Sequence, residues 1–196
     1  KGSESHVIMI TSANPGSGKT FISFNLATSL GIKGKRIIAI DLDLRKASLS
    51  QYAGRPKKGI SDYLAGDVKD IKDVIVKPSG DAKIDLIPVG TVPPNPTELL
   101  FSERLEQLIP DLRAEYDYIF IDCPPSLELL TLNALCAADS ILVPVQGEYF
   151  ALEGLSDLMN TVRIVRRGQN PGLEIEGVLL TMFDGRTNLS IQVAQE

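Results

Sequence analysis

The chain is poor in the residues on which metal centres, disulfide frameworks and histidine chemistry depend. It has 2 cysteines and 1 histidine among 196 residues. Cys123 and Cys136 lack a second pair at metal-ligand spacing, which argues against a zinc site, and we interpret them as reduced thiols of a cytosolic protein. His6 opens an apolar run, where a surface residue is a more ordinary interpretation than a catalyst.

Long apolar runs, a signal-peptide pattern, internal repeats and low-complexity tracts are also missing. The sequence therefore predicts no transmembrane segment and a cytoplasmic protein, which would reach a membrane only through a partner. The net charge of −5 argues against a protein that coats DNA with its whole surface. A hydrophobic content of 43% suits a single domain over residues 1–196.

A glycine-rich segment follows the first apolar run, residues 6–11. It reads Asn14-Pro15-Gly16-Ser17-Gly18-Lys19-Thr20-Phe21 and is typical of a phosphate-binding loop between a strand and a helix. In such loops backbone N–H groups surround phosphate oxygens, the lysine reaches the β- and γ-phosphates, and the threonine hydroxyl binds Mg²⁺. Ala13 stands where the first glycine is usual, and an ordinary glycine-rich turn is the alternative interpretation. We predict ATP or ADP with Mg²⁺ as the cofactors.

Apolar strands alternate with helical patterns along the chain. This order predicts an α/β fold of the P-loop NTPase type, with a mostly parallel sheet and helices on both faces. We expect strands at 6–11, 36–41, 84–88, 116–122, 140–145 and 175–182. We expect helices at 21–30, 60–64, 101–112, 126–137 and 150–166, and another from 188 onward. The proline-rich segment 93–98 is expected to be a loop, and Pro110 to kink or restart a helix.

Two of the predicted strands end in an acidic residue. Asp41 ends one strand and is followed by Asp43, and Asp122 ends another. Ligands of open parallel sheets bind beyond the carboxyl ends of the strands, so these carboxylates can converge on Lys19 and Thr20. We expect Thr20, Asp122 and Asp41 to be the metal ligands. We expect Lys19, Asp41, Asp43 and Asp122 to be catalytic, with Asp41 positioning the attacking water. A solvated loop is an equal alternative for Asp43.

The first part of the chain, residues 6–122, resembles the bacterial tyrosine kinases that use a P-loop fold. The matching segments are SANPGSGKT, IIAIDLDLR, KKGISDYL, VGTVPPNPTELL and YDYIFIDCPP. Residues 122–196 instead resemble the ParA/Soj chromosome-partition ATPases, through DCPPSLELLTLNAL, AADSILVPVQGEYFALEGLSDLMNTVR and LEIEGVLLTMFDGRTNLSIQVAQE. Both groups belong to the deviant Walker A superfamily, which includes MinD. A changeover near residues 120–125 indicates a chimera, and a natural intermediate is the alternative.

The chain also departs from both families. The resemblance implies a signature lysine that reaches the partner subunit's nucleotide, and Asn14 stands at that position. It implies a tyrosine-rich tail in the kinases, but no tyrosine follows Tyr149. It implies a further strand and DNA-binding basic residues after the last residue of this chain, so we expect a truncated C-terminus and no support for DNA binding by this fragment. It places adenine recognition near Thr181, Met182 and Phe183, for which core or edge packing is an equal alternative.

The leading hypothesis is an ATP-binding domain with weak Mg²⁺-dependent ATPase activity, weak because no cation from a second subunit stabilises the developing charge. One alternative is the catalytic domain of a protein-tyrosine kinase. Another is a partition-type switch that forms a homodimer on binding ATP and then binds a protein partner. A last alternative is a protein built to join fragments of related folds.

Overall fold

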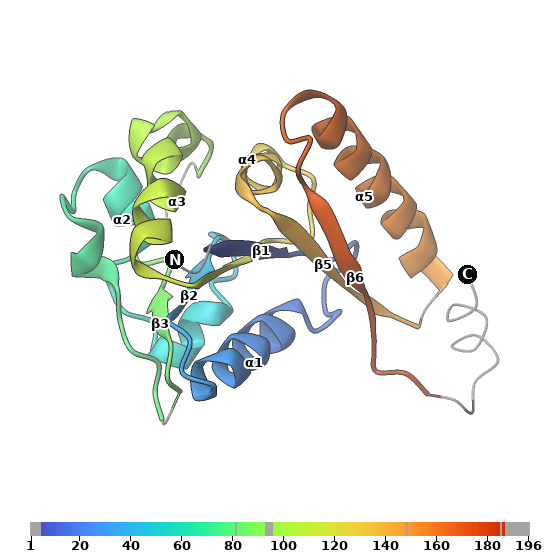
Figure 1. The fold of residues 1–196 in the computed structure, drawn as a ribbon, viewed down its shortest axis with the longest axis horizontal. Helices are drawn as coiled ribbons and strands as arrows, with labels where there is room; N and C mark the ends of the chain where they lie inside the picture. Colours follow the sequence, from blue (N-terminus) through green and yellow to red (C-terminus); the bar gives the residue numbers. More distant parts are fainter. Residues whose placement is uncertain (1–4, 81, 93–95, 148, 185, 187–196) are drawn as a thin grey trace.

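The computed structural model describes residues 5–80, 82–92, 96–147, 149–184 and 186. Within them, six parallel strands form one sheet in the order β3-β2-β4-β1-β5-β6 (Figure 1). The strands are β1 (His6–Ile10), β2 (Ile37–Asp41), β3 (Asp85–Ile87), β4 (Tyr118–Asp122), β5 (Ser140–Gln146) and β6 (Glu174–Thr181). The α-helices are α1 (Lys19–Ile32), α2 (Ile60–Ala65), α3 (Glu103–Glu115), α4 (Leu129–Ala137) and α5 (Tyr149–Gly168). The 3₁₀ helices are η1 (Leu49–Ala53), η2 (Ile71–Val74) and η3 (Pro96–Phe101).

Helices cover both faces of this sheet, which confirms the predicted α/β class. Helix α1 lies on one face, and α2, α3, α4 and α5 lie on the other (Figure 1). Two apolar cores correspond to these two faces, because side chains of a strand alternate between them. In β1, Val7 and Met9 belong to the core beneath α2 to α5, whereas Ile8 and Ile10 belong to the core beneath α1. Among the described residues, no helix combines the length and apolar character needed to cross a bilayer.

The order of the strands brings three strand ends together. In the parallel register, Asp122 of β4 pairs with Asp41 of β2 on one side and with Ile10 of β1 on the other. The segment that follows Ile10 leads directly into α1. The two predicted acidic strand ends and the predicted phosphate-binding loop therefore meet at one edge of the sheet, as expected for ligands of open parallel sheets.

The structure corrects the expected loop at 93–98 and one of the two effects expected of Pro110. Residues Pro96–Phe101 form η3 rather than an extension of the loop, because proline suits the first position of a helix, where its missing N–H has no partner to lose. Helix α3 continues through Pro110 and does not restart there, while the alternative expectation, a kink, stays a prediction. Glu106, four residues earlier, is exposed, so water can replace the backbone donor that Pro110 lacks. The helix expected from residue 188 onward lies outside the described residues.

Candidate nucleotide-binding site

The segment between β1 and α1 turns through glycines that have left-handed backbone conformations. Gly16 has a φ of 83° and Gly18 a φ of 79°, a region that other residues rarely enter. The hydroxyls of Ser12 and Ser17 donate to the carbonyl oxygen of Asn14, at 2.7 and 2.8 Å. These bonds hold a tight loop immediately before the first turn of α1, where N–H groups are free of helical partners and favour an anion.

The first turn of α1 is joined to the end of β4. The Thr20 hydroxyl donates to Oδ2 of Asp122 at 2.7 Å. The other oxygen of this carboxylate, Oδ1, is buried and has no hydrogen-bond partner among the described residues. Burial raises the pKa of Asp122 to about 7, although the charge of Lys19 acts in the opposite direction. A buried carboxylate oxygen without a donor is costly, so this site is prepared for a positive ligand.

Thr20 and Asp122 are suitable ligands for a magnesium ion that is also bound by phosphate and water. They are too few to hold a metal ion by protein ligands alone. Thr20 and Asp122 offer hard oxygen ligands next to the phosphate-binding loop. In the part of the chain that the structure describes, no three or more His, Cys, Asp or Glu side chains gather into a metal cluster. Magnesium keeps several waters and is usually bound by one or two protein oxygens together with phosphate oxygens. The donor set therefore fits Mg²⁺ accompanied by a nucleotide.

Lys19 points toward the end of β2. Its ammonium nitrogen lies 3.4 Å from Oδ2 of Asp43, and both side chains are almost fully buried. The second oxygen of Asp43 accepts from the backbone N–H of Lys46 at 3.1 Å. Lys19 and Asp43, two of the residues predicted to be catalytic, are thus in direct contact.

Asp41 lies on the α1 side of the sheet, and its carboxylate is hydrogen-bonded to the segment that follows β2. Its Oδ2 accepts from both the N–H and the hydroxyl of Ser50, each at 2.7 Å, and its Oδ1 accepts from the N–H of Asp43 at 3.2 Å. Burial raises the pKa of Asp41 to about 6, and the bonds from Ser50 oppose that rise. The contacts of Asp41 among the described residues therefore order the loop after β2, and its predicted roles in metal binding and in positioning water stay predictions.

The end of β6 reaches the phosphate-binding loop, where the sequence placed adenine recognition. The Thr181 hydroxyl donates to the carbonyl oxygen of Ser17 at 3.0 Å. Met182 follows with a φ of 53° and is largely exposed, as is Phe183. Phe21, in the first turn of α1, is 61% exposed. Thr181 is thus brought to the loop, while Met182 and Phe21 offer uncovered apolar surface beside it.

Helix α5 also contacts the loop, through a residue that the sequence analysis missed. A Cβ atom at Gly154 would lie 2.8 Å from the Cβ of Ala13 and 3.6 Å from Oδ1 of Asn14. Glycine inside a helix costs about 1 kcal/mol relative to alanine, so its presence there was a usable signal of close packing. Gly154 makes room for the methyl group that Ala13 carries in place of the usual glycine.

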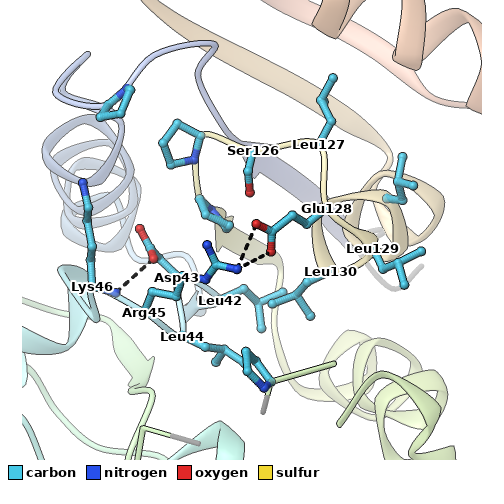
Figure 2. A pocket seen from close by; sticks show the side chains of 15 residues that line it. Leu42, Asp43, Leu44, Arg45, Lys46, Ser126, Leu127, Glu128, Leu129 and Leu130 are labelled. Atoms are coloured by element: carbon cyan, nitrogen blue, oxygen red, sulfur yellow. Dashed lines mark hydrogen bonds and ion pairs between the residues drawn. The ribbon is translucent and has the colours of Figure 1, made fainter. Parts of the chain in front are cut away.

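A pocket of about 640 Å³ opens beside the loop, between the segments that follow β2 and β4 (Figure 2). Pro15 belongs to its wall, together with Asp43 and several leucines. Arg45 and Glu128 form an ion pair inside it, with Nη2 of the arginine 3.0 and 3.1 Å from the two carboxylate oxygens. Sequence alone gave no sign of this pair, because 83 residues separate its members.

Comparison with known proteins identifies the relatives of this chain. A family model described as "AAA domain" matches residues 5–175. The sporulation initiation inhibitor protein Soj of Bacillus subtilis is 43% identical over 201 residues, which cover 97% of this chain and 78% of Soj. This similarity extends across residues 120–125, the expected changeover between families, and the chimeric origin stays a prediction.

Two solved structures place the geometry among nucleotide-binding proteins. Cobyrinic acid a,c-diamide synthase from Mycobacterium smegmatis, with bound ADP and magnesium, has a TM-score of 0.85 and 29% identity, covering 97% of this chain and 80% of that one. The kinase domain of the Escherichia coli tyrosine kinase ETK has a TM-score of 0.82 and 30% identity, covering 96% and 71%. Partition-protein and kinase relatives are thus both similar to this chain, as the sequence motifs predicted.

Proposed function

Since this chain belongs to the AAA domain family of P-loop ATPases that includes Soj, we propose that it binds ATP with Mg²⁺ and hydrolyses it slowly. The observation that carries the proposal is the buried Oδ1 of Asp122, which has no hydrogen-bond partner within the described part of the chain and lies next to the Thr20 hydroxyl and the phosphate-binding loop. A structural carboxylate would have both oxygens satisfied, as Asp41 has.

Each residue has a role that follows from its contacts. The N–H groups around Gly16 and Gly18 surround the phosphates, and Lys19 leaves Asp43 to neutralise the terminal phosphate. Asp43 is then free to orient a water and to accept its proton. Thr20 and Asp122 would hold Mg²⁺, and the ion would supply positive charge that offsets the negative charge of the phosphates. Asp41 and Ser50 keep the loop that carries Asp43 in place.

Slow turnover follows from the residue at the entrance of the loop. Asn14 is uncharged, whereas the resemblance to partition ATPases implies a lysine there. Cations that stabilise the transition state of phosphoryl transfer are worth about 10³–10⁵ in rate. We therefore expect nucleotide binding to be readily measurable and the steady-state rate of ATP hydrolysis to be low.

Substitution of the loop lysine tests the proposal. Lys19→Ala should abolish measurable ADP and ATP binding in titration calorimetry, because the phosphates lose their principal side-chain cation. Lys33→Ala, at the opposite end of α1, should bind like the wild type. Equal nucleotide affinities of the Lys19→Ala variant and the wild type would refute the proposal.

A nucleotide-dependent switch is a second candidate, favoured by the 43% identity to Soj. In this case ATP with Mg²⁺ would convert a monomer into a homodimer that then binds a protein partner. Light scattering with ATP and with ADP measures the shift directly. Asn14→Lys should strengthen dimerisation and hydrolysis, and a variant that changes neither would remove the support for this candidate.

A phosphoryl transfer to tyrosine is a third candidate, favoured by the likeness to the ETK kinase domain and by the pocket beside the loop. It predicts transfer of label from γ-labelled ATP to a tyrosine-containing peptide. Asp43→Asn should abolish that transfer, because no carboxylate would then accept the hydroxyl proton. Release of free phosphate without peptide labelling would exclude this candidate.

A further inference from the structure

The ion pair between Arg45 and Glu128 lies in the pocket beside the phosphate-binding loop. Arg45 follows β2, and Glu128 precedes α4 in the segment after β4. Figure 2 shows the guanidinium group inside the pocket, facing the carboxylate. The same pocket is lined by Pro15 of the phosphate-binding loop and by Asp43, which contacts Lys19.

The exposure of Arg45 and Glu128 limits what their ion pair contributes to the fold. Glu128 occupies the N-cap position of α4, yet its side chain makes no capping hydrogen bond. The Arg45 side chain is 70% exposed and that of Glu128 is 51% exposed. Ion pairs at such exposure contribute little to stability and are easily exchanged for a stronger partner.

We propose, resting on the ATPase function proposed above, that Arg45 is a catalytic cation for the terminal phosphate of ATP and that Glu128 holds it away when the site lacks nucleotide. An arginine supplied in cis can stabilise the charge that develops during phosphoryl transfer. Its planar group binds phosphate oxygens in pairs, and the charge of a triphosphate exceeds that of one carboxylate.

The position of Arg45 suits this role. It is two residues after Asp43, whose Oδ2 is 3.4 Å from the Lys19 ammonium group. The charged groups on this side of the pocket are Asp43, Arg45, Lys46 and Glu128. Among the described residues, the hydrogen bond from Lys46 to Asp43 uses the backbone N–H of Lys46, whereas the Arg45 side chain is held by its ion pair with Glu128. Arg45 would then partly compensate for the uncharged Asn14.

Removal of the carboxylate charge tests the holding role of Glu128. Glu128→Gln should raise kcat for ATP hydrolysis by up to about fivefold, the range expected when one exposed ion pair no longer competes. The matched control is Glu115→Gln, since Glu115 is also 51% exposed and pairs with Lys72 on a different part of the surface. This control should leave kcat unchanged. An unchanged or lower kcat for Glu128→Gln would overturn the proposal.

Removal of the cation tests Arg45 itself. Arg45→Ala should lower kcat at least about tenfold, and Arg45→Lys should retain part of the rate. Affinity for ADP should stay within about twofold, because ADP lacks the phosphate that Arg45 would touch. When Glu128→Gln is combined with Arg45→Ala, it should no longer raise kcat, because the cation that it would release is absent.

The outcomes separate this proposal from the ATPase function. Equal kcat values for the wild type and Arg45→Ala, with normal nucleotide binding, would overturn only the role of Arg45. A fall in ADP affinity as large as the fall in kcat would also overturn it, since Arg45 would then support binding in general. A wild type that binds neither nucleotide would overturn both.

Discussion

The buried carboxyl group of Asp122 should make the nucleotide-free protein less stable as pH rises. Burial raises its pKa to about 7 in the folded chain, from an ordinary value of 3.8. The folded state therefore binds more protons than the unfolded state between these values, and the free energy of unfolding falls as pH increases through this range. At 1.36 kcal/mol per pKa unit, the whole loss is about 4 kcal/mol.

Asp122→Asn removes this titration while preserving the size of the side chain. Between about pH 5 and pH 8, the wild type should lose about 3 kcal/mol more stability than the variant. Lys19, Asp41 and Asp43 face the site in both proteins, so the contribution of Asp41, whose pKa is about 6, largely cancels from the difference. Any constant packing effect of asparagine cancels as well.

Urea denaturation at the two pH values, with EDTA present, measures the effect. The chain has no tryptophan, so far-ultraviolet circular dichroism is the suitable signal. The same variant should lose the Mg²⁺ dependence of ADP binding, because one of the two proposed ligands is gone. A stability difference between wild type and variant that stays constant with pH would refute the reasoning, since it would mean that the carboxyl is not desolvated.

Two further predictions follow from contacts around the site. Ser50→Ala should lower the free energy of unfolding by about 1–3 kcal/mol in urea denaturation, because the buried Asp41 carboxylate loses a donor and the N–H of Val89 loses its acceptor. An unchanged midpoint would show that water replaces the hydroxyl. Gly154→Ala should weaken ADP binding in calorimetry by displacing the phosphate-binding loop, and adding Ala13→Gly should restore it. Failure of the second substitution to restore affinity would contradict a direct contact between the two methyl groups.

Local patterns in the sequence determined the class of fold and the type of site. Continuous apolar runs marked the buried strands, and their alternation with helical patterns predicted a parallel sheet with two covered faces. The loop that ends in Lys19 and Thr20 depends on residues adjacent in the chain, and so does the position of Asp122 at a strand end. Pro110 shows the limit of such reasoning, because the helix that contains it continues to Glu115 instead of restarting.

Only the tertiary structure decided which of the predicted carboxylates carries an unsatisfied charge. Asp41 and Asp122 look alike in sequence, each ending an apolar strand. Ser50 and the N–H of Asp43 satisfy both oxygens of Asp41, whereas Oδ1 of Asp122 has no hydrogen-bond partner in the residues that the structure describes. The Arg45–Glu128 pair also depends on how two loops meet in space. The physical reason is that hydrogen bonds and charges act over a few ångströms, so partners distant in sequence are set by strand order and register.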